Sequence, residues 1–358
     1  NETLSILIFS IYNLIFSKNI PNYAVIDSAV ELAKSLKLKN YNFINAILRK
    51  VSNKKDFQSY DQHIINSYAK WLYSMLLKQY GKIDLNTIIN WNNTNRDIYL
   101  RYQSKETLRN LTNYLDKEKI SYSVFEDFEY YIKINKINST IAKQITINNF
   151  AYIQSPSSGF VVKLLNPKKT DIIVDACSAP GGKSIHISNL LNNKGTIYSY
   201  EINKSRFSLL EENIHNFNIN NILSFNEDFR DCKIKNINKI LIDAPCTGTG
   251  VIHRKPDIKI RRRYNDLIKF TELQSSLLNY AGSIIEKNGT IVYSTCSILN
   301  EENWHIINNF INTYKNFKIV HARDYVDIKY VDANGALSIL PHIHSLDGMF
   351  AVKLLRYN

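Results

Sequence analysis

Cysteine, proline and glycine are all scarce in this 358-residue sequence, which contains 4, 7 and 11 of them. The cysteines are Cys177, Cys232, Cys246 and Cys296. No two of them form a Cys-x-x-Cys pair, which excludes a disulfide-rich secreted scaffold and a cysteine-built zinc module. His186, His215 and His305 fall on expected helices without ligand spacing, so no metal site is expected. This cysteine usage indicates a reducing, cytoplasmic setting.

Long hydrophobic runs are also lacking. The apolar stretch of residues 4–16 is only about half as long as a helix that crosses a bilayer. Ser5, Ser10 and Asn13 interrupt it and no basic region precedes it, which argues against a signal peptide. We expect it to form a buried helix and expect no membrane partner. Because the sequence does not begin with Met, we also expect its first domain to be incomplete at the N-terminus.

Acidic residues are outnumbered by basic ones. The sequence has 45 Lys and Arg against 32 Asp and Glu, a net charge of +13 and a pI near 9.3. This surplus indicates a polyanionic partner, with nucleic acid as the first candidate and an anionic membrane surface as the second. Hydrophobic residues make up 44%, which excludes a disordered chain, and the length predicts two or more domains.

Three regions differ in the periodicity of their apolar residues. Residues 1–90 show helical spacing, as in "AVIDSAVELAKSL", and predict an all-α domain whose last helix ends at Gly81. Residues 91–150 mix short alternating runs with one helical stretch and predict a small α+β linker domain. Residues 151–358 alternate strands and helices, which predicts an α/β domain with a mostly parallel sheet. Its seven expected strands are residues 171–176, 196–200, 222–225, 239–243, 289–294, 317–320 and 349–355.

A glycine turn follows the first strand of the expected sheet. In "CSAPGGKS", residues 177–184, Gly181 and Gly182 allow a ligand to approach the backbone closely. Neither Gly-x-Gly-x-x-Gly nor a P-loop is present. A tight strand-to-helix turn explains the glycines but not the acids Glu201, Asp228 and Asp243, which follow the next strands. Ligands bind at this edge of such sheets, and acids without a pyrophosphate loop favour S-adenosyl-L-methionine (SAM), whose sulfonium and amino groups are cationic.

Two of the cysteines stand where strands end. Cys246 follows a strand in "KILIDAPC" and Cys296 follows another in "TIVYSTC". A lone strand-end cysteine is usually a small buried hydrophobe, and the pattern itself does not rank the two. A basic segment follows Cys246, "HRKPDIKIRRRYND", with Arg254, Lys255, Lys259, Arg261, Arg262 and Arg263. Such a run is usually a solvated face, but beside the expected cleft it predicts contacts with RNA phosphates.

The motifs "DACSAPGGKS", "DAPCTGTGVIHRKPDIK" and "YSTCSILNEEN" resemble, in this order, those of the RsmB/Nop/Sun (NSUN) family of RNA cytosine-5 methyltransferases. Its bacterial 16S rRNA members are the most similar, and "FINAILRKV" resembles the last helices of a NusB-like RNA-binding domain. The resemblance implies a NusB-like domain (1–90), the linker domain (91–150) and a Rossmann-like SAM-dependent catalytic domain (151–358). It also implies methylation of carbon 5 of a 16S rRNA cytosine, of the position-967 type. The sequence leaves open whether free rRNA or an assembly intermediate is the substrate, and we expect a monomer.

The resemblance further assigns roles to residues. Cys296 is implied as the nucleophile that adds to carbon 6 of cytosine, and Cys246 as the residue that assists product release. Lys183 is expected to organise the acids, and Asp243 to contact the cytosine edge or the cofactor. SAM contacts are implied for Cys177, Ser178, Ala179, Pro180, Gly181, Gly182, Lys183, Glu201, Asp228 and Asp243. Many family members have Asp where this sequence has Glu201, and Cys232 matches no motif and is expected to be a buried hydrophobe.

Other functions remain in view. The enzyme could act on another rRNA or a tRNA cytosine. A nicotinamide-dependent oxidoreductase would need the Gly-x-Gly-x-x-Gly loop, which is absent, and would leave both cysteine motifs without a role. A non-catalytic RNA-binding or antitermination factor suits the basic charge and the first domain, but it has no need of Cys296, Cys246 or the strand-end acids.

Overall fold

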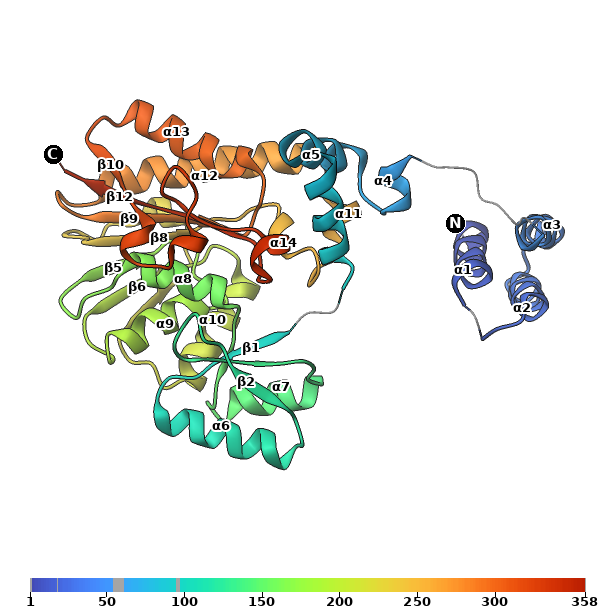
Figure 1. Ribbon diagram of the computed structural model, residues 1–358, viewed down its shortest axis with the longest axis horizontal. Helices are drawn as coiled ribbons and strands as arrows, with labels where there is room; N and C mark the ends of the chain where they lie inside the picture. Colours follow the sequence, from blue (N-terminus) through green and yellow to red (C-terminus); the bar gives the residue numbers. More distant parts are fainter. Residues whose placement is uncertain (1, 18, 54–60, 95–96, 358) are drawn as a thin grey trace. The chain divides into compact units, whose positions relative to one another are not determined.

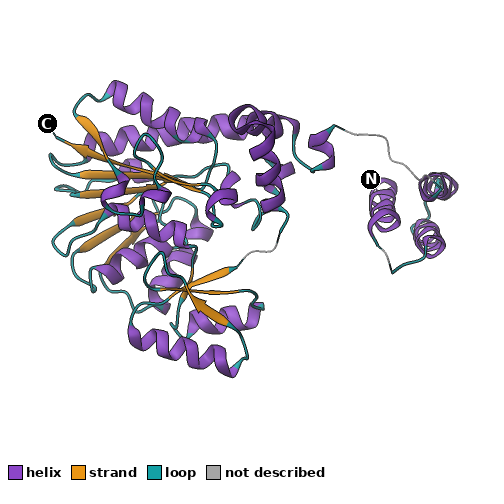
Figure 2. Ribbon diagram, viewed as in Figure 1, coloured by secondary structure: helices purple, strands orange, loops and turns teal. Residues whose placement is uncertain are grey.

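The computed structural model describes residues 2–17, 19–53, 61–94 and 97–357 (Figure 1, Figure 2). The chain divides into two compact units between Ile65 and Asn66. In the described ranges, no helix combines the length and the apolar character that a membrane span requires.

The first unit is helical. Its helices are α1 (Glu2–Phe16), α2 (Asn22–Ser35), α3 (Tyr41–Ser52) and α4 (Gln62–Ile65). Ile6 of α1, Ala33 of α2 and Leu48 of α3 are among the residues that form its core. The predicted helix over residues 4–16 is confirmed, but the prediction that it is buried is wrong for most of it. Only Ile6 and Ser10 of α1 are buried and Phe9 is 71% exposed, because short packed helices each bury a single stripe.

The second unit begins with a long, interrupted helix, α5 (Lys70–Asn92). Gly81, the expected end of a helix, breaks the helical path with φ 75° and ψ 175°, a backbone conformation open to glycine, and the helix then resumes. Leu72 and Leu85 of α5 belong to one apolar cluster with Ile252 and Ile298, which follow the strands of the main sheet. The structural division therefore comes before α5, whereas the sequence pattern puts a boundary near residue 90.

A small α+β layer follows α5. Its strands are β1 (Ile98–Arg101), β2 (Tyr122–Val124), β3 (Tyr131–Ile134) and β4 (Tyr152–Ile153), and its helices are α6 (Lys105–Lys117) and α7 (Ser139–Ile147). The strands pair antiparallel in the order β2-β3-β1-β4. The expected α+β character of this region is confirmed, while α7 and the two-residue β4 were not among the expected elements.

The main sheet contains all seven expected strands. They are β5 (Ile172–Asp175), β6 (Thr196–Tyr200), β7 (Ile222–Phe225), β8 (Lys239–Asp243), β9 (Thr290–Thr295), β10 (Phe317–Val320) and β12 (Met349–Arg356). Their order is β10-β12-β9-β8-β5-β6-β7, and an unexpected strand, β11 (Leu337–Ile339), pairs with β12. Strands β5 to β9 are parallel, and β12 runs antiparallel between β9 and β10. The predicted mostly parallel sheet is confirmed.

Helices connect the strands of this sheet, and the longer ones cover its two faces. They are α8 (Pro156–Leu165), α9 (Gly182–Leu190), α10 (Lys204–Asn216), α11 (Ile258–Arg261), α12 (Tyr264–Ile284), α13 (Trp304–Thr313) and α14 (Pro341–His344). Short 3₁₀ turns are η1 (Phe229–Asp231), η2 (Thr249–Val251), η3 (Asn300–Glu302), η4 (Ala322–Asp324) and η5 (Ile328–Tyr330). Figure 1 shows α12 and α13 on one face and α8 and α9 on the other.

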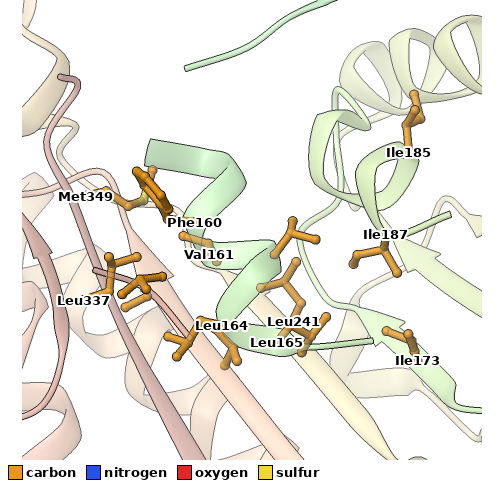
Figure 3. Packing of buried hydrophobic residues seen from close by; sticks show 14 of the residues in the cluster. Phe160, Val161, Leu164, Leu165, Ile173, Ile185, Ile187, Leu241, Leu337 and Met349 are labelled. Atoms are coloured by element: carbon orange, nitrogen blue, oxygen red, sulfur yellow. The ribbon is translucent and has the colours of Figure 1, made fainter. Parts of the chain in front are cut away.

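The core lies on both faces of the sheet, because successive strand residues point to opposite sides. Leu241 of β8 belongs to the cluster that also contains Phe160 and Leu164 of α8 (Figure 3). Its neighbour Ile242 belongs to the cluster on the other face, with Leu278 of α12. Each such fully buried aliphatic side chain contributes about 1.5–3 kcal/mol. The central strands are therefore rigid supports for the loops at their ends.

Candidate active site

The carboxyl ends of three parallel strands lie side by side, because β5, β8 and β9 are neighbours in the sheet. The glycine turn follows β5, Cys246 follows β8 and Cys296 follows β9. Ligands of open parallel sheets bind beyond these ends. The fold thus brings to one edge three motifs that are far apart in the sequence.

Two free thiols lie in contact at this edge. The Sγ atoms of Cys246 and Cys296 are 3.3 Å apart. The contact with Cys246 lowers the pKa of the Cys296 thiol, and the charge of Lys183 acts in the same direction. The contact with Cys296, together with burial, raises the pKa of the Cys246 thiol. Since two interacting thiols titrate as a pair, the first proton is lost preferentially from Cys296.

Hydrogen bonds join the two loops that carry these thiols. The N–H of Gly250 donates to the carbonyl of Cys296 at 2.9 Å, and the N–H of Ile298 donates to Oγ1 of Thr249 at 3.0 Å. A Cβ atom at Gly250 would stand 2.9 Å from the carbonyl oxygen of Cys296. The glycine after "CTGT" is therefore required by the close approach of the loops.

An ion pair lies beside the thiols. Nζ of Lys183 is 2.6 Å from Oδ2 of Asp243, and Oγ of Ser294 donates to Oδ1 of Asp243 at 2.9 Å. The Lys183 side chain is only 9% exposed, while that of Asp243 is 33% exposed. Lys183 is therefore held in place, and Asp243 remains accessible to a ligand.

Asp175, the last residue of β5, is a candidate that the sequence analysis missed. It is buried, its Oδ2 accepts a hydrogen bond from Oγ of Ser184 at 2.6 Å, and its Oδ1 has no partner among the described residues. Burial raises the pKa of its carboxyl to about 7. The sequence did contain a signal, because Asp175 ends its strand just as Asp243 does.

Two hollows at this edge have Cys177 in common. The first has a volume of about 330 Å³ and is lined by residues that include Ser178, Lys183, Asp175 and Asp243. The second has a volume of about 240 Å³ and is lined by residues that include Glu201, Asp228, Phe229 and Leu277. Both are lined by acids, and the second also offers apolar surface that suits a flat ring. Burial raises the pKa of the Cys177 thiol well above its usual range, so this thiol stays protonated and lines the hollows without reacting.

The two acids of the second hollow are held by neighbouring groups. Glu201 is 4% exposed, and its Oε1 accepts the N–H of Asn203 at 2.9 Å while Oε2 lies 3.5 Å from Nη1 of Arg206. Asp228 forms an ion pair with Arg230 at 2.6 Å, and hydrogen bonds from that guanidinium hold the pKa of the Asp228 carboxyl low. Carboxylates in this position can accept hydrogen bonds from ribose hydroxyls.

The glycine turn is supported by a buried arginine that sequence reasoning also missed. Arg101, at the end of β1, is 1% exposed. Its Nε donates to Oε1 of Gln154 at 2.7 Å, and its Nη2 lies 3.3 Å from the carbonyl of Gly182. A Cβ atom at Gly182 would stand 2.9 Å from Nε2 of the same Gln154. The small α+β layer therefore contacts the turn directly, which no local pattern in the sequence signals.

The basic segment after Cys246 is not one solvated face. Lys259 is only 8% exposed, and its Nζ donates to Oδ1 of Asn93 at 2.5 Å above the ring of Tyr68. The RNA contact predicted for Lys259 does not fit this position, because its charge is enclosed by the chain. Lys255, Arg261 and Arg263 are exposed.

The two other arginines of this segment are fixed by the protein. Nε of Arg254 lies 2.9 Å from each carboxylate oxygen of Asp347, and Arg254 lines the first hollow. Nε of Arg262 donates to the carbonyl of Thr247 at 3.2 Å. Cys232, by contrast, is buried in the apolar cluster under α12, as expected for a cysteine outside the motifs. The described residues include no group of three acids, histidines or cysteines placed to hold a metal ion.

Sequence comparison decides the family. A model of the family described as 16S rRNA methyltransferase RsmB/F matches residues 162–355, and a model of the NusB family matches residues 2–53. The chain is 31% identical over 98% of its length to the probable ribosomal RNA small subunit methyltransferase B of Bacillus subtilis (strain 168), of which 82% is covered. The chain belongs to the RsmB/F family. The ribosomal RNA small subunit methyltransferase B of Yersinia enterocolitica is 28% identical over 98% of this RsmB/F chain and 81% of its own length.

Solved structures share the fold of this RsmB/F protein. PH0851 matches 96% of the chain with a TM-score of 0.83 and 22% identity, with 80% of its own chain covered. NSun6 from Pyrococcus horikoshii, crystallised with SFG, matches 82% of the chain with a TM-score of 0.72 and 21% identity, with 100% of its own chain covered. The expected Rossmann-like methyltransferase fold behind a NusB-type domain is confirmed.

The cofactor of this RsmB/F protein is SAM, and the residues present fit it. The unpartnered oxygen of Asp175 and the accessible carboxylate of Asp243 line one hollow, where a cationic amino acid moiety would find negative charge. Glu201 and Asp228 line the other, where they would hold the ribose. When bound, SAM supplies an electrophilic methyl group.

Proposed function

We propose that this chain methylates carbon 5 of a cytosine in 16S rRNA. The observation that carries the proposal is the pair of thiols 3.3 Å apart after neighbouring strands, at the sheet edge where Asp175 and Asp243 line the cofactor hollow. An enzyme that methylated a more nucleophilic atom, such as an exocyclic amine, would have no need of a thiol. The names of the relatives in Bacillus and Yersinia, small subunit rRNA methyltransferases, support the substrate class.

The chemistry assigns the first thiol. Carbon 5 of cytosine is a weak nucleophile, so a direct attack on a methyl group is slow. The Cys296 thiolate adds to carbon 6, and the electron pair of the carbon 5–carbon 6 double bond is displaced, which makes carbon 5 nucleophilic. Carbon 5 then takes the methyl group, whose bond to the donor sulfur breaks. Covalent catalysis of this kind divides one difficult step into two easier ones. The lowered pKa of Cys296 supports its role as the nucleophile.

The adduct must then be resolved. A base removes the proton from carbon 5, the electron pair restores the ring double bond, and the carbon–sulfur bond breaks to return the Cys296 thiolate. Cys246 lies next to this sulfur and is the group we assign to release. Asp243 is fixed by Lys183 and one-third exposed, so its carboxylate can accept a hydrogen bond from the cytosine amino group.

The target base must leave its stack to reach a thiol at the end of a buried strand. This favours an unpaired or loop cytosine in the RNA. Arg261 and Arg263 are exposed near the Cys246 loop and can neutralise phosphates there. We expect a monomer to be sufficient, because both thiols and both hollows belong to one chain.

Bisulfite mapping of small-subunit rRNA, with and without the protein and SAM, tests the function. One newly protected cytosine is expected in 16S rRNA, and it is lost with Cys296→Ala. The matched variant Cys246→Ala is expected to accumulate a protein–RNA adduct that survives denaturant. Protection of a tRNA or large-subunit rRNA cytosine instead would show that the substrate is not 16S rRNA. Transfer of methyl groups without any protected cytosine would reject methylation at carbon 5.

A further inference from the structure

A buried carboxylate connects the two cysteine loops. Glu302 is 0% exposed, and its Oε1 accepts the backbone N–H of Thr247 at 2.8 Å. Its Oε2 accepts the hydroxyl of the same Thr247. Thr247 directly follows Cys246, whereas Glu302 belongs to the motif that contains Cys296. The Glu302 side chain therefore links the Cys296 motif to the Cys246 loop through two hydrogen bonds.

The turn around Cys246 is held on both sides. Nε2 of Gln274, from α12, donates to the carbonyl of Pro245 at 2.8 Å and to Oε1 of Glu302 at 3.1 Å. Pro245 precedes Cys246 and Thr247 follows it, so the thiol has little freedom to move. The main chain of Glu302 is fixed in turn, because its carbonyl accepts the hydroxyl of Tyr293 in β9 at 2.7 Å.

Charged groups surround the thiol pair unevenly. Lys183 and Asp243 both act on Cys296, with opposite signs. Asp243 and Glu302 act on both sulfur atoms, and both carboxylates disfavour a negative charge there. The carboxylate of Glu302 is bound to the residue next to Cys246, so its effect on that sulfur is the more direct one. A thiolate is therefore favoured on the Lys183 side of the pair.

We propose that Glu302 is a positioning residue that holds the Cys246 turn against Cys296 and, through its negative charge, keeps the proton of the thiol pair on Cys246. The proposal rests on the proposed function only in the use that it assigns to the Cys296 thiolate. The geometry itself involves the protein alone, so it can be tested without RNA and without methyl transfer.

Glu302→Gln separates charge from shape, because the amide can still accept the Thr247 N–H. Alkylation of Cys246 and Cys296 by iodoacetamide is followed in the full chain by mass spectrometry from pH 5.5 to 9. In the variant, the midpoint for Cys246 is expected to move to lower pH, with its alkylation rate at pH 7 rising about tenfold for each unit of the shift. The neighbouring Glu301→Gln is the control and should leave both midpoints in place. Unchanged midpoints in a folded Glu302→Gln protein would overturn the proposal.

Glu302→Asp tests the positioning itself. It keeps the charge but shortens the side chain by one methylene group, so the turn should shift away from Cys296 and the rate at which a mild oxidant joins Cys246 to Cys296 should fall about tenfold. An unchanged oxidation rate in Glu302→Asp would reject the positioning role, including the case in which Glu302→Gln does not fold. If the thiol midpoints behave as expected but no cytosine is methylated, the proposed function fails and this inference stands.

Discussion

Lys183 and Asp243 form an ion pair with Nζ and Oδ2 2.6 Å apart, and this pair ties the helix after the glycine turn to the end of β8. Asp243 would otherwise place an uncompensated negative charge next to the thiol of Cys296. With Lys183 in place, the carboxylate stays available for a ligand while the cation favours the Cys296 thiolate. The consequence of the ion pair for the nucleophile can be tested by mutation.

Replacing Lys183 with Met should impair the nucleophile more than the fold. Alkylation of Cys296 is expected to require a higher pH, because the cation that favours its thiolate is gone, and methyl transfer should fall more than tenfold at neutral pH. Because Asp243 is one-third exposed, the loss of stability should be only about 1–2 kcal/mol. The exposed Lys204→Met variant is the control. Normal methyl transfer by Lys183→Met would contradict the role assigned to the ion pair.

Asp175→Asn should change how stability depends on pH. Burial raises the carboxyl pKa from its usual value of about 4 to about 7, so the folded protein binds a proton that the unfolded chain releases between these pH values. The free energy of unfolding of the native protein should therefore fall as pH rises from about 4 to 7. The decline should be about 1 kcal/mol for each pH unit, and it should be absent in Asp175→Asn. Urea unfolding at pH 5 and pH 7 measures the free energy of unfolding, with the exposed Asp324→Asn as control. The same pH dependence in Asp175→Asn and in the native protein would contradict the raised pKa of Asp175.

Replacing both Arg261 and Arg263 with Gln should weaken RNA binding without altering SAM binding. If each arginine neutralises one phosphate, the slope of the logarithm of the binding constant against the logarithm of salt concentration should become shallower by about 1.4–1.8. Filter binding at several salt concentrations measures the slope, and calorimetry measures SAM binding. Lys259→Gln is a contrasting variant, which should reduce stability because Lys259 is enclosed. An unchanged slope would remove the two arginines from the RNA interface.

Gly250→Ala should force the two cysteine loops apart. Its Cβ atom would stand 2.9 Å from the carbonyl oxygen of Cys296 and 2.8 Å from Cα of Gly348. Overpacking of this kind costs about 1–3 kcal/mol, measurable as a lower thermal midpoint. The rate at which a mild oxidant joins Cys246 to Cys296 should also fall, because the sulfur atoms no longer lie in contact. A variant with native stability and native oxidation rate would show that the loops tolerate the added methyl group.

Sequence patterns located the strands well because each strand is a short, largely apolar run between polar turns. The predicted bounds of 196–200, 222–225, 239–243 and 317–320 agree with β6, β7, β8 and β10. The three-residue β11 was missed because so short a run has no readable periodicity. Sequence patterns predict the contacts of a side chain less well, because Arg101 and Glu302 contact residues that only the fold brings near them. Lys259 shows the same limit, because a run of charges does not reveal which one the chain encloses.

The position of β12 affects when the site can form during synthesis. Strand β9, which leads to Cys296, pairs with β8 on one side and with Met349–Arg356 on the other. The ribosome makes β12 after every other strand of the sheet, so β9 lacks this partner until residues 349–356 have been made. A chain stopped short of residue 349 would therefore leave β9 with an unpaired edge of buried residues, which invites aggregation.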